Sequence, residues 1–226
     1  MSEKTKFVNR DTLSERFDTL IDVGVRNRKV DVPDSVFSSS HITECPRRLI
    51  YRSQGANKDF ELMPYMRAQA ELSVKNRWYA YLEKSKGIRL IEKQYKAFDC
   101  TYNLRGDIDF VISAFDKNMV VQVHSVKNYP QILKEGASKK HVIEAMINAW
   151  LMEVKEGIVI YENSDTLDTI SFHVTLYKPI IESTKKICLS LFRAKMEGKI
   201  PDPPYADQSG KECLSCEFKT VCQGAL

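Results

Sequence analysis

Apolar residues recur at two different periods along the chain. In the first third they recur at helical spacing, which predicts helices over about 11–26, 40–52 and 62–86. The middle of the chain alternates apolar and polar residues through "IRLIEKQYKAF", "CTYNLRG", "DIDFVISAF" and "MVVQVHSVK", with interruptions at Gly106 and at the turn "DKN". This alternation predicts a meander of three or four strands.

The second half of the chain returns to helical spacing and then alternates again. A helix is expected in "SKKHVIEAMINAWLMEVKE", with Ser138 as its cap, and two further strands in "GIVIYEN" and "TISFHVTLYK". A long helix begins near Pro179, and the tail "IPDPPYADQSG" is extended. The order of elements predicts an α/β or α+β fold, with a mixed central sheet flanked by helices.

Three parts are expected along the chain. Residues 1–34 would form an N-terminal helix and linker, residues 35–200 the core, and residues 201–226 an extended tail that carries cysteines. On the helix over 62–86, an apolar stripe is expected to face the core. Its members are Tyr65, Leu72, Trp78, Tyr79 and Leu82.

Composition and charge narrow the class of protein. The chain has 226 residues, of which 43% are hydrophobic and 28% charged, which is typical of a globular protein. No apolar run approaches the roughly 20 residues that span a bilayer, and the N-terminus lacks a signal-peptide pattern, so a cytoplasmic protein without membrane contact is expected. The net charge of +4 permits a polyanionic partner without requiring one.

Three of the six cysteines crowd the C-terminus. Cys213, Cys216 and Cys222 have the spacing Cys-x2-Cys-x5-Cys, which suits three thiolate ligands of one metal centre. Cys45 is our candidate for the fourth ligand, because "ECPRRL" opens a helix. Four thiolates could hold zinc or a [4Fe–4S] cluster, and the spacing does not choose between the two.

The two other cysteines are expected to be buried and inert. Cys100 is placed within a strand, and Cys188 lies on a helix face with Ile187 and Leu191. Without a secretion signal, a disulfide framework is not expected.

Three motifs together resemble a known family. Cys45-Pro-Arg-Arg, the Gly106-x-x-Asp109 strand and the terminal Cys-x2-Cys-x5-Cys resemble the iron–sulfur branch of the PD-(D/E)XK nucleases. That branch includes CRISPR-associated exonucleases and the nuclease domains of RecB/AddB-type helicase–nucleases. The resemblance extends over about 35–222; the cysteine pattern is specific, whereas Gly-x-x-Asp alone is weak. It implies a restriction-endonuclease-like core, with the tail closing onto Cys45.

The resemblance also implies where catalytic groups stand. Asp109 takes the position of a ligand for Mg²⁺ or Mn²⁺, and Asp107 is an additional carboxylate on the same strand face. The next strand departs from the family pattern Glu-x-Lys, since Gln122 stands in place of the acid and His124 in place of the lysine. Gln122 offers an oxygen without charge, and a histidine is mostly neutral at pH 7.

The helices depart from the family as well. The resemblance implies a metal-binding histidine on the long helix before the sheet, but no histidine occurs between His41 and His124. On the helix after the sheet, Glu144 and Asn148 stand where the family usually has a Gln and a Tyr. Glu144 could supply the carboxylate that the second strand lacks.

The departures leave several functions open. One is a DNA-binding protein with lost or weakened cleavage, acting in DNA replication, recombination or repair. A second is an active metal-dependent exonuclease with an altered site. A third is a protein–protein adaptor in a replication or transcription complex. The plainest alternative treats the hairpin residues as polar positions at the edge of a sheet.

Basic and aromatic residues are candidates for contacts to DNA, expected as single strands or ends. The candidates for phosphate contacts are Arg47, Arg48, Arg52, Lys127, Lys134, Lys139 and Lys140. Tyr51, Tyr129 and Trp150 could stack on unpaired bases, although core packing is a common role for such residues.

Overall fold

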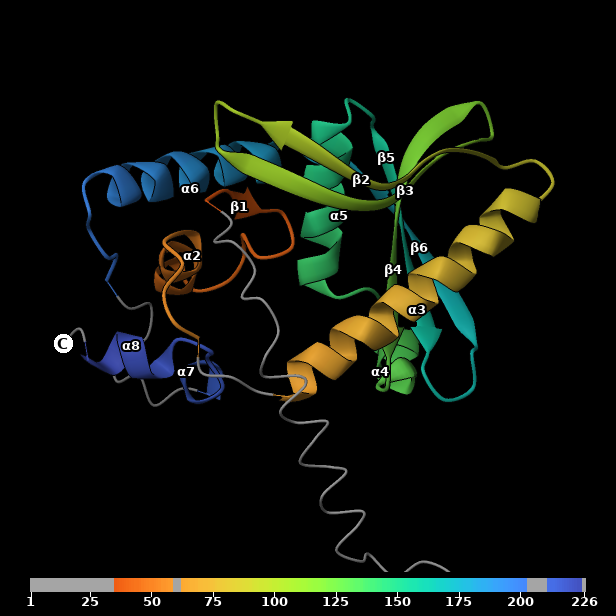
Figure 1. The fold of residues 1–226 in the computed structure, drawn as a ribbon. Helices are drawn as coiled ribbons and strands as arrows, with labels where there is room; N and C mark the ends of the chain where they lie inside the picture. Colours follow the sequence, from red (N-terminus) through yellow and green to blue (C-terminus); the bar gives the residue numbers. More distant parts are fainter. Residues whose placement is uncertain (1–34, 59–61, 203–210, 225–226) are drawn as a thin grey trace, which may run out of the picture.

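The computed structural model describes residues 35–58, 62–202 and 211–224 (Figure 1). The helix expected over 11–26 lies outside these residues. The elements in chain order are β1 (Phe37–Ser38), α2 (Pro46–Ser53), α3 (Leu62–Lys84), β2 (Arg89–Asp99), β3 (Leu104–Ala114), β4 (Lys117–Val126), α4 (Tyr129–Glu135), α5 (Lys139–Leu151), β5 (Glu156–Asn163), β6 (Thr169–Thr175), α6 (Lys178–Met196), α7 (Lys211–Leu214) and α8 (Lys219–Gly224). Among the described helices, none combines the length and the apolar character that a bilayer crossing requires.

The six strands form one mixed sheet. Its order is β1-β3-β4-β5-β6, and β2 pairs with β3 off this path. The β3–β4 and β5–β6 pairs are antiparallel, whereas β4 and β5 are parallel because α5 crosses over between them. The expected fold class, a mixed sheet flanked by helices, is confirmed.

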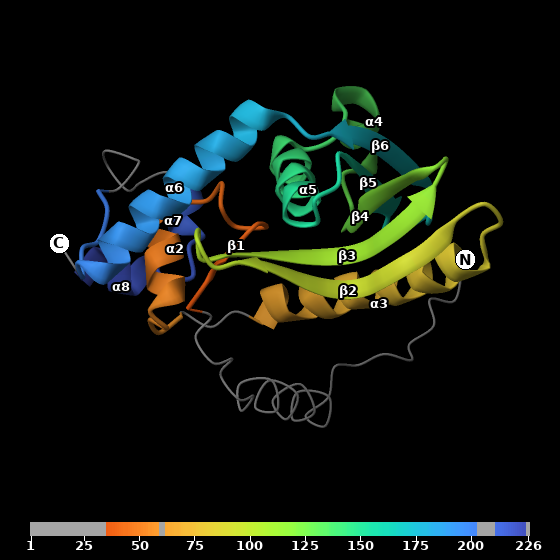
Figure 2. The same cartoon turned by 90° about the horizontal axis from the view of Figure 1, so that it is seen from above.

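Helices cover both faces of the sheet, with α3 on one side and α5 on the other (Figure 2). On the α3 side, Val74 and Leu82 are buried against Phe110 and Val121. The stripe predicted for this helix is wrong at Leu72, which is 42% exposed. Val74, Trp78 and Leu82 recur every four residues, so they share the buried face and turn Leu72 away from it.

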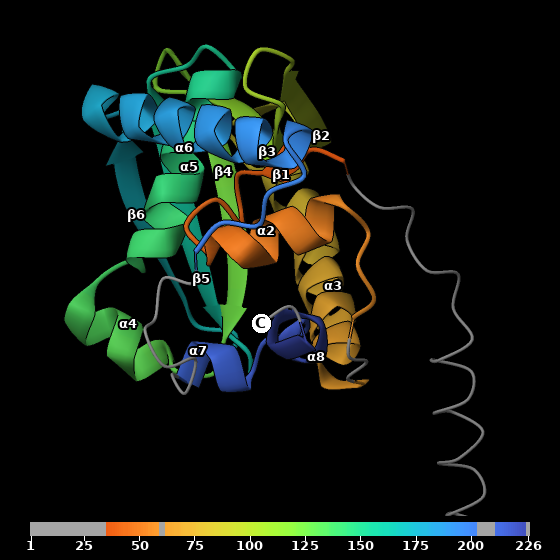
Figure 3. The same ribbon diagram turned by 90° about the vertical axis from the view of Figure 1, so that its left-hand side faces the viewer.

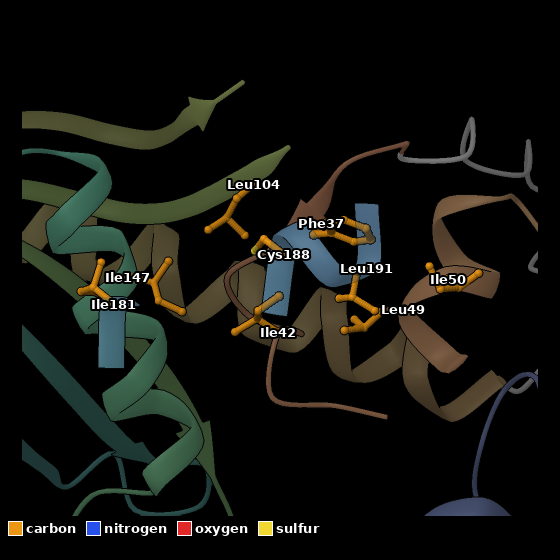
Figure 4. Packing of buried hydrophobic residues seen from close by; sticks show 9 residues of the cluster. All are labelled: Phe37, Ile42, Leu49, Ile50, Leu104, Ile147, Ile181, Cys188 and Leu191. Carbon is orange, nitrogen blue, oxygen red and sulfur yellow. The ribbon is translucent and has the colours of Figure 1, made fainter. Parts of the chain in front are cut away.

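The helices α2, α6, α7 and α8 gather at one end of the molecule (Figure 3). One buried cluster joins α2 and α6 to α5 and to the start of β3 (Figure 4). Its members are Phe37, Ile42, Leu49, Ile50, Leu104, Ile147, Ile181, Cys188 and Leu191. This cluster confirms the burial of Cys188 and fixes α2, which follows Cys45, to the sheet.

Two local expectations are corrected by the structure, and one helix was not predicted. The helix predicted over 40–52 begins only at Pro46, whose ring suits the first turn, and Cys45 is its N-cap residue. Cys100 is exposed in the turn between β2 and β3, so its expected burial within a strand is wrong. The sequence pattern also gave no sign of the short helix α4 after β4.

Candidate functional site

Asp109 lies where the strands β3 and β4 separate. The backbone ladder between them runs from Ala114↔Lys117 to Phe110↔Val121. One residue further along β3, Oδ2 of Asp109 accepts a hydrogen bond of 2.8 Å from the backbone N–H of Val123. The carboxylate therefore binds β4 beyond the end of the ladder, and Asp109 is only 7% exposed.

Gly106 allows α5 to approach the same strand closely. A Cβ atom at this position would lie 2.5 Å from Oδ1 of Asn148 and 2.8 Å from Cδ1 of Leu151. Because residue 106 is a glycine, Asn148 can lie close to β3, and its Nδ2 donates a hydrogen bond of 3.3 Å to the backbone carbonyl of Asp107. The glycine of Gly106-x-x-Asp109 thus has a packing role: it admits the helix that carries Glu144.

Lys75 reaches Asp109 from α3, and the sequence analysis missed it. Its Nζ lies 2.8 Å from Oδ1 of Asp109. Burial alone would lower the pKa of Lys75, but Asp109, together with Glu71 and Glu144, raises that pKa above its usual value. The sequence did offer one signal. Lys75 lies on the long helix before the sheet, where the resembled family places a metal-binding residue.

Asp107 adds charge to the site but is bound elsewhere. Its Oδ2 accepts hydrogen bonds from Nη2 of Arg105 at 3.0 Å and from the Ser38 hydroxyl at 3.2 Å. The Asp107 side chain remains 37% exposed. Asp107 therefore acts on Asp109 and Glu144 through its negative charge, which contributes to raising the pKa of both acids.

Gln122 is buried and His124 is half-buried, and neither carries a charge. Gln122 is 1% exposed, and its Oε1 has no hydrogen-bond partner among the described residues. The His124 ring stacks on His141, with 3.6 Å between ring centroids and 7° between planes. Burial, and then His141, lower the pKa of His124 well below its usual value, so the imidazole is neutral at pH 7.

His141 is held by Tyr161 on β5. The Tyr161 hydroxyl accepts a hydrogen bond from the backbone N–H of Ser138 at 2.9 Å and lies 2.9 Å from Nδ1 of His141. With the Ser138 amide as its donor, the hydroxyl can give its own proton to an unprotonated Nδ1. Burial lowers the pKa of His141 to about 4, in agreement with this neutral form.

Glu144 completes the group from α5. It is 6% exposed. Burial, followed by the charge of Asp109, raises the pKa of Glu144 to about 7, so this acid exchanges a proton near neutral pH. The structure therefore brings together Asp109, Lys75 and Glu144, with the neutral Gln122 and His124 behind them.

These residues do not fit a Mg²⁺ or Mn²⁺ ion well. Such ions prefer several oxygen ligands, including charged ones. Each oxygen of Asp109 already faces a donor, and one of these donors is an ammonium group. Over the described ranges, no three His, Cys, Asp or Glu side chains are grouped so that they could hold a metal ion.

The four cysteines of the predicted cluster line one cavity. Cys45, Cys213, Cys216 and Cys222 all border a space of about 340 Å³ between α2 and the segment that carries α7 and α8. Nη1 of Arg47 donates to Sγ of Cys222 at 3.4 Å, and the backbone N–H of Phe218 donates to Sγ of Cys216 at 3.5 Å. Hydrogen bonds of this kind accompany sulfur ligands of iron–sulfur clusters, but over the described ranges the four thiols border the cavity without being grouped as the ligands of one metal ion.

Ion pairs tie this C-terminal segment to α2. Glu217 binds both Arg48 and Arg52, and Glu44 binds the same two arginines from the start of the helix. Nε of Arg47 donates to the Pro201 carbonyl at 2.7 Å. The three arginines that we expected at phosphates therefore make intramolecular contacts in the structure.

The lysines that were predicted to contact phosphate are more exposed to solvent than these arginines. Lys127, Lys134, Lys139 and Lys140 are exposed. Lys140 also lies 3.1 Å from Glu44 and borders the cysteine cavity. The charge of Lys140 also acts to lower the pKa of Glu144 and of His141.

The predicted aromatic residues serve mainly in packing. Tyr51 and Tyr129 are only 3% and 7% exposed, so neither offers a ring face to a base. Trp150 packs edge-on against Tyr102, with 5.7 Å between ring centroids.

Solved structures with this fold include nucleases. The alkaline exonuclease LHK-Exo from Laribacter hongkongensis aligns with a TM-score of 0.56 at 8% identity, over 74% of this chain and 90% of that one. Its crystal structure in complex with dAMP gives the same TM-score at 9% identity, over 73% and 89%. SSO0001 aligns with a TM-score of 0.51 at 15% identity, over 96% of this chain and 98% of its own.

The similarity is one of fold. No protein-family model matches the sequence, and none of the curated proteins matches it. The alignments show that this chain shares its overall architecture with the alkaline exonuclease LHK-Exo.

Proposed function

We propose that this protein binds DNA through a nuclease-like fold whose own cleavage chemistry is lost, and that it acts in DNA replication, recombination or repair. One observation carries the proposal: Gln122 and His124 are neutral where the resembled family has an acid and a lysine. The similarity to an alkaline exonuclease supports nucleic acid as the ligand class.

The missing charges are expected to slow the hydrolysis of DNA. Hydrolysis of a phosphodiester builds negative charge on the phosphate, and fixed positive charge close to it lowers the barrier. A neutral, half-buried imidazole at position 124 cannot supply that charge. Losses of this kind typically cost about 10³-fold in rate, so cleavage is expected to be absent or very slow.

Binding to DNA does not need these groups. Phosphate contacts depend on exposed cations, and Lys127, Lys139 and Lys140 are exposed beside the site. Lys139 and Lys140 open α5, where free backbone N–H groups also favour anions. We propose single-stranded DNA or DNA ends as the ligand of this surface.

We further propose that Cys45, Cys213, Cys216 and Cys222 hold a [4Fe–4S] cluster, with zinc as the alternative. Support comes from their shared cavity and from the hydrogen bonds to Cys216 and Cys222. A bound centre would link the C-terminal segment covalently to α2 and could supply redox chemistry there.

A second candidate function has one observation in its favour. Glu144 is an acid with a pKa of about 7 close to Asp109, and such a group could act in proton transfer. An altered but active exonuclease is therefore the alternative. In that case cleavage would depend on Glu144.

DNA binding is tested by fluorescence anisotropy with labelled single-stranded DNA over a range of salt concentrations. We expect salt-dependent binding that a metal chelator leaves unchanged. Replacing Lys139 and Lys140 by Ala should weaken it and reduce the slope of log K against log salt by about 1 to 2. The control replaces Lys84 and Lys86, which are exposed near the C-terminal end of α3. No binding by the wild type, or equal loss in both double variants, would contradict the proposed surface.

A further inference from the structure

From this geometry we infer that Lys75 is a built-in cation that takes the place of a divalent metal ion at Asp109. The inference rests on the proposed function, because it treats the β3–β4 junction as a nuclease-like site. Nζ of Lys75 lies 2.8 Å from Oδ1 of Asp109, and Oδ2 accepts the N–H of Val123 at 2.8 Å. Both carboxylate oxygens of Asp109 are therefore engaged by groups of the protein itself.

The ion pair is partly shielded from water. The Asp109 side chain is 10% exposed and the Lys75 side chain 28% exposed. A metal ion could reach Asp109 only by displacing the ammonium group, which would leave a partly buried positive charge without its partner. The ammonium group and a metal cation would also repel each other at this distance.

The helix that carries Lys75 is fixed on the sheet. Val74 is 6% exposed and packs in the core. On the next turn, Arg77 and Trp78 both bind the carboxylate of Glu162, with 2.9 Å from Nε1 of Trp78 to Oε2. Glu162 lies on β5 and is 2% exposed. Contacts on both sides of Lys75 therefore hold its backbone in position above Asp109.

The other oxygen atoms near the site do not offer a metal ion an alternative to the Asp109 carboxylate, which Lys75 already binds. Oε1 of Gln122 is buried and unbonded among the described residues, but it carries no charge. Asp107 is engaged by Arg105 and Ser38. The resembled family draws a metal-binding histidine from the helix before the sheet, and this chain draws a lysine to the same carboxylate. The site thus carries its positive charge permanently, in a form that cannot coordinate and activate water.

The test is a titration of the full-length protein with Mn²⁺ alone, without DNA, followed by isothermal calorimetry and by the electron paramagnetic resonance signal of free Mn²⁺. We expect no Asp109-dependent binding by the wild type. Lys75→Met keeps the length of the side chain and removes its charge. This variant should bind Mn²⁺ at least about tenfold more tightly than any residual binding by the wild type. That gain should disappear when Asp109→Asn is added. Lys84→Met, at the exposed end of the same helix, is the matched control.

Two outcomes would overturn the inference. One is Mn²⁺ binding by the wild type that Asp109→Asn abolishes, a result that needs no Lys75 variant to fold. The other is a Lys75→Met variant with a native circular dichroism spectrum and no gain in Mn²⁺ affinity. Failure of the proposed function would look different, as DNA cleavage or an absence of DNA binding. A wild type that binds Mn²⁺ but does not cut DNA would refute this inference alone.

Discussion

The amide oxygen of Asn148 lies where a side chain at Gly106 would have to be, at 2.5 Å from the position of a Cβ atom. This relationship links α5 to β3 at the start of the Gly106-x-x-Asp109 motif. The motif glycine sets the distance between the strand that carries Asp109 and the helix that carries Glu144.

Gly106→Ala is therefore expected to destabilise the fold by about 1–3 kcal/mol, because Asn148 and Leu151 must move to admit the new methyl group. Urea denaturation followed by circular dichroism measures this difference. Gly224→Ala is the control, since nothing lies within 4 Å of a Cβ atom there. Equal unfolding midpoints for Gly106→Ala and the wild type would contradict the close packing.

Glu144 is expected to make stability depend on pH. Its pKa is about 7 in the folded protein, against a usual value of 4.5. The folded state thus binds the proton more tightly, so this contribution is fully present below about pH 4.5 and is lost as the pH rises through about 7. Glu144→Gln stays neutral, and its stability relative to the wild type should rise by about 3 kcal/mol between these limits.

The measurement is a series of urea denaturation curves for both proteins from about pH 4.5 to about pH 8. Contributions from His124 and His141 cancel in the difference between the two proteins. Glu182→Gln is the control, because the Glu182 side chain is 61% exposed. A difference that stays constant across the series would contradict the raised pKa.

Cys45 is predicted to be a metal ligand. The protein, purified under anaerobic conditions, should contain iron and inorganic sulfide and absorb visible light. Cys45→Ala should lose most of both, whereas Cys100→Ala should keep them because Cys100 is exposed in a turn away from the cavity. Zinc without iron in the wild type would contradict the cluster, and equal metal content in Cys45→Ala would contradict the ligand assignment.

Glu217 is predicted to hold the C-terminal segment onto α2. It pairs with Arg48 and Arg52, so Glu217→Ala leaves two partly buried arginines with less compensation. We expect a loss of about 1–2 kcal/mol and faster proteolysis near α7 and α8. Limited proteolysis with mass spectrometry locates the cuts, and Glu182→Ala serves as the exposed control. Unchanged cleavage in the C-terminal segment would contradict this role.

The sequence predicted the parts of the site that depend on local periodicity. Alternation placed Asp109 and Gln122 on neighbouring strands, and both are buried at the junction of β3 and β4. The cysteine spacing predicted a common location, and the four cysteines line one cavity. These features follow from strand geometry and from residue spacing, which a single sequence displays directly.

Other parts depend on contacts between distant elements. The bond from Lys75 to Asp109 requires the packing angle of α3 on the sheet, which no local pattern contains. The stacking of His124 on His141 likewise joins β4 to α5. The predicted phosphate contacts of Arg48 and Arg52 did not account for Glu44 and Glu217, whose charges meet those arginines only in the folded chain.

Cleavage of DNA tests the central claim most directly. Labelled single-stranded and double-stranded DNA would be incubated with Mg²⁺ or Mn²⁺ and the wild type, Asp109→Ala, or the double variant Gln122→Glu with His124→Lys. The account predicts no metal-dependent cleavage by the wild type, none by the double variant while Lys75 still binds Asp109, and a gain of cleavage when Lys75→Met is added to the double variant. Cleavage by the wild type that Asp109→Ala abolishes would contradict it.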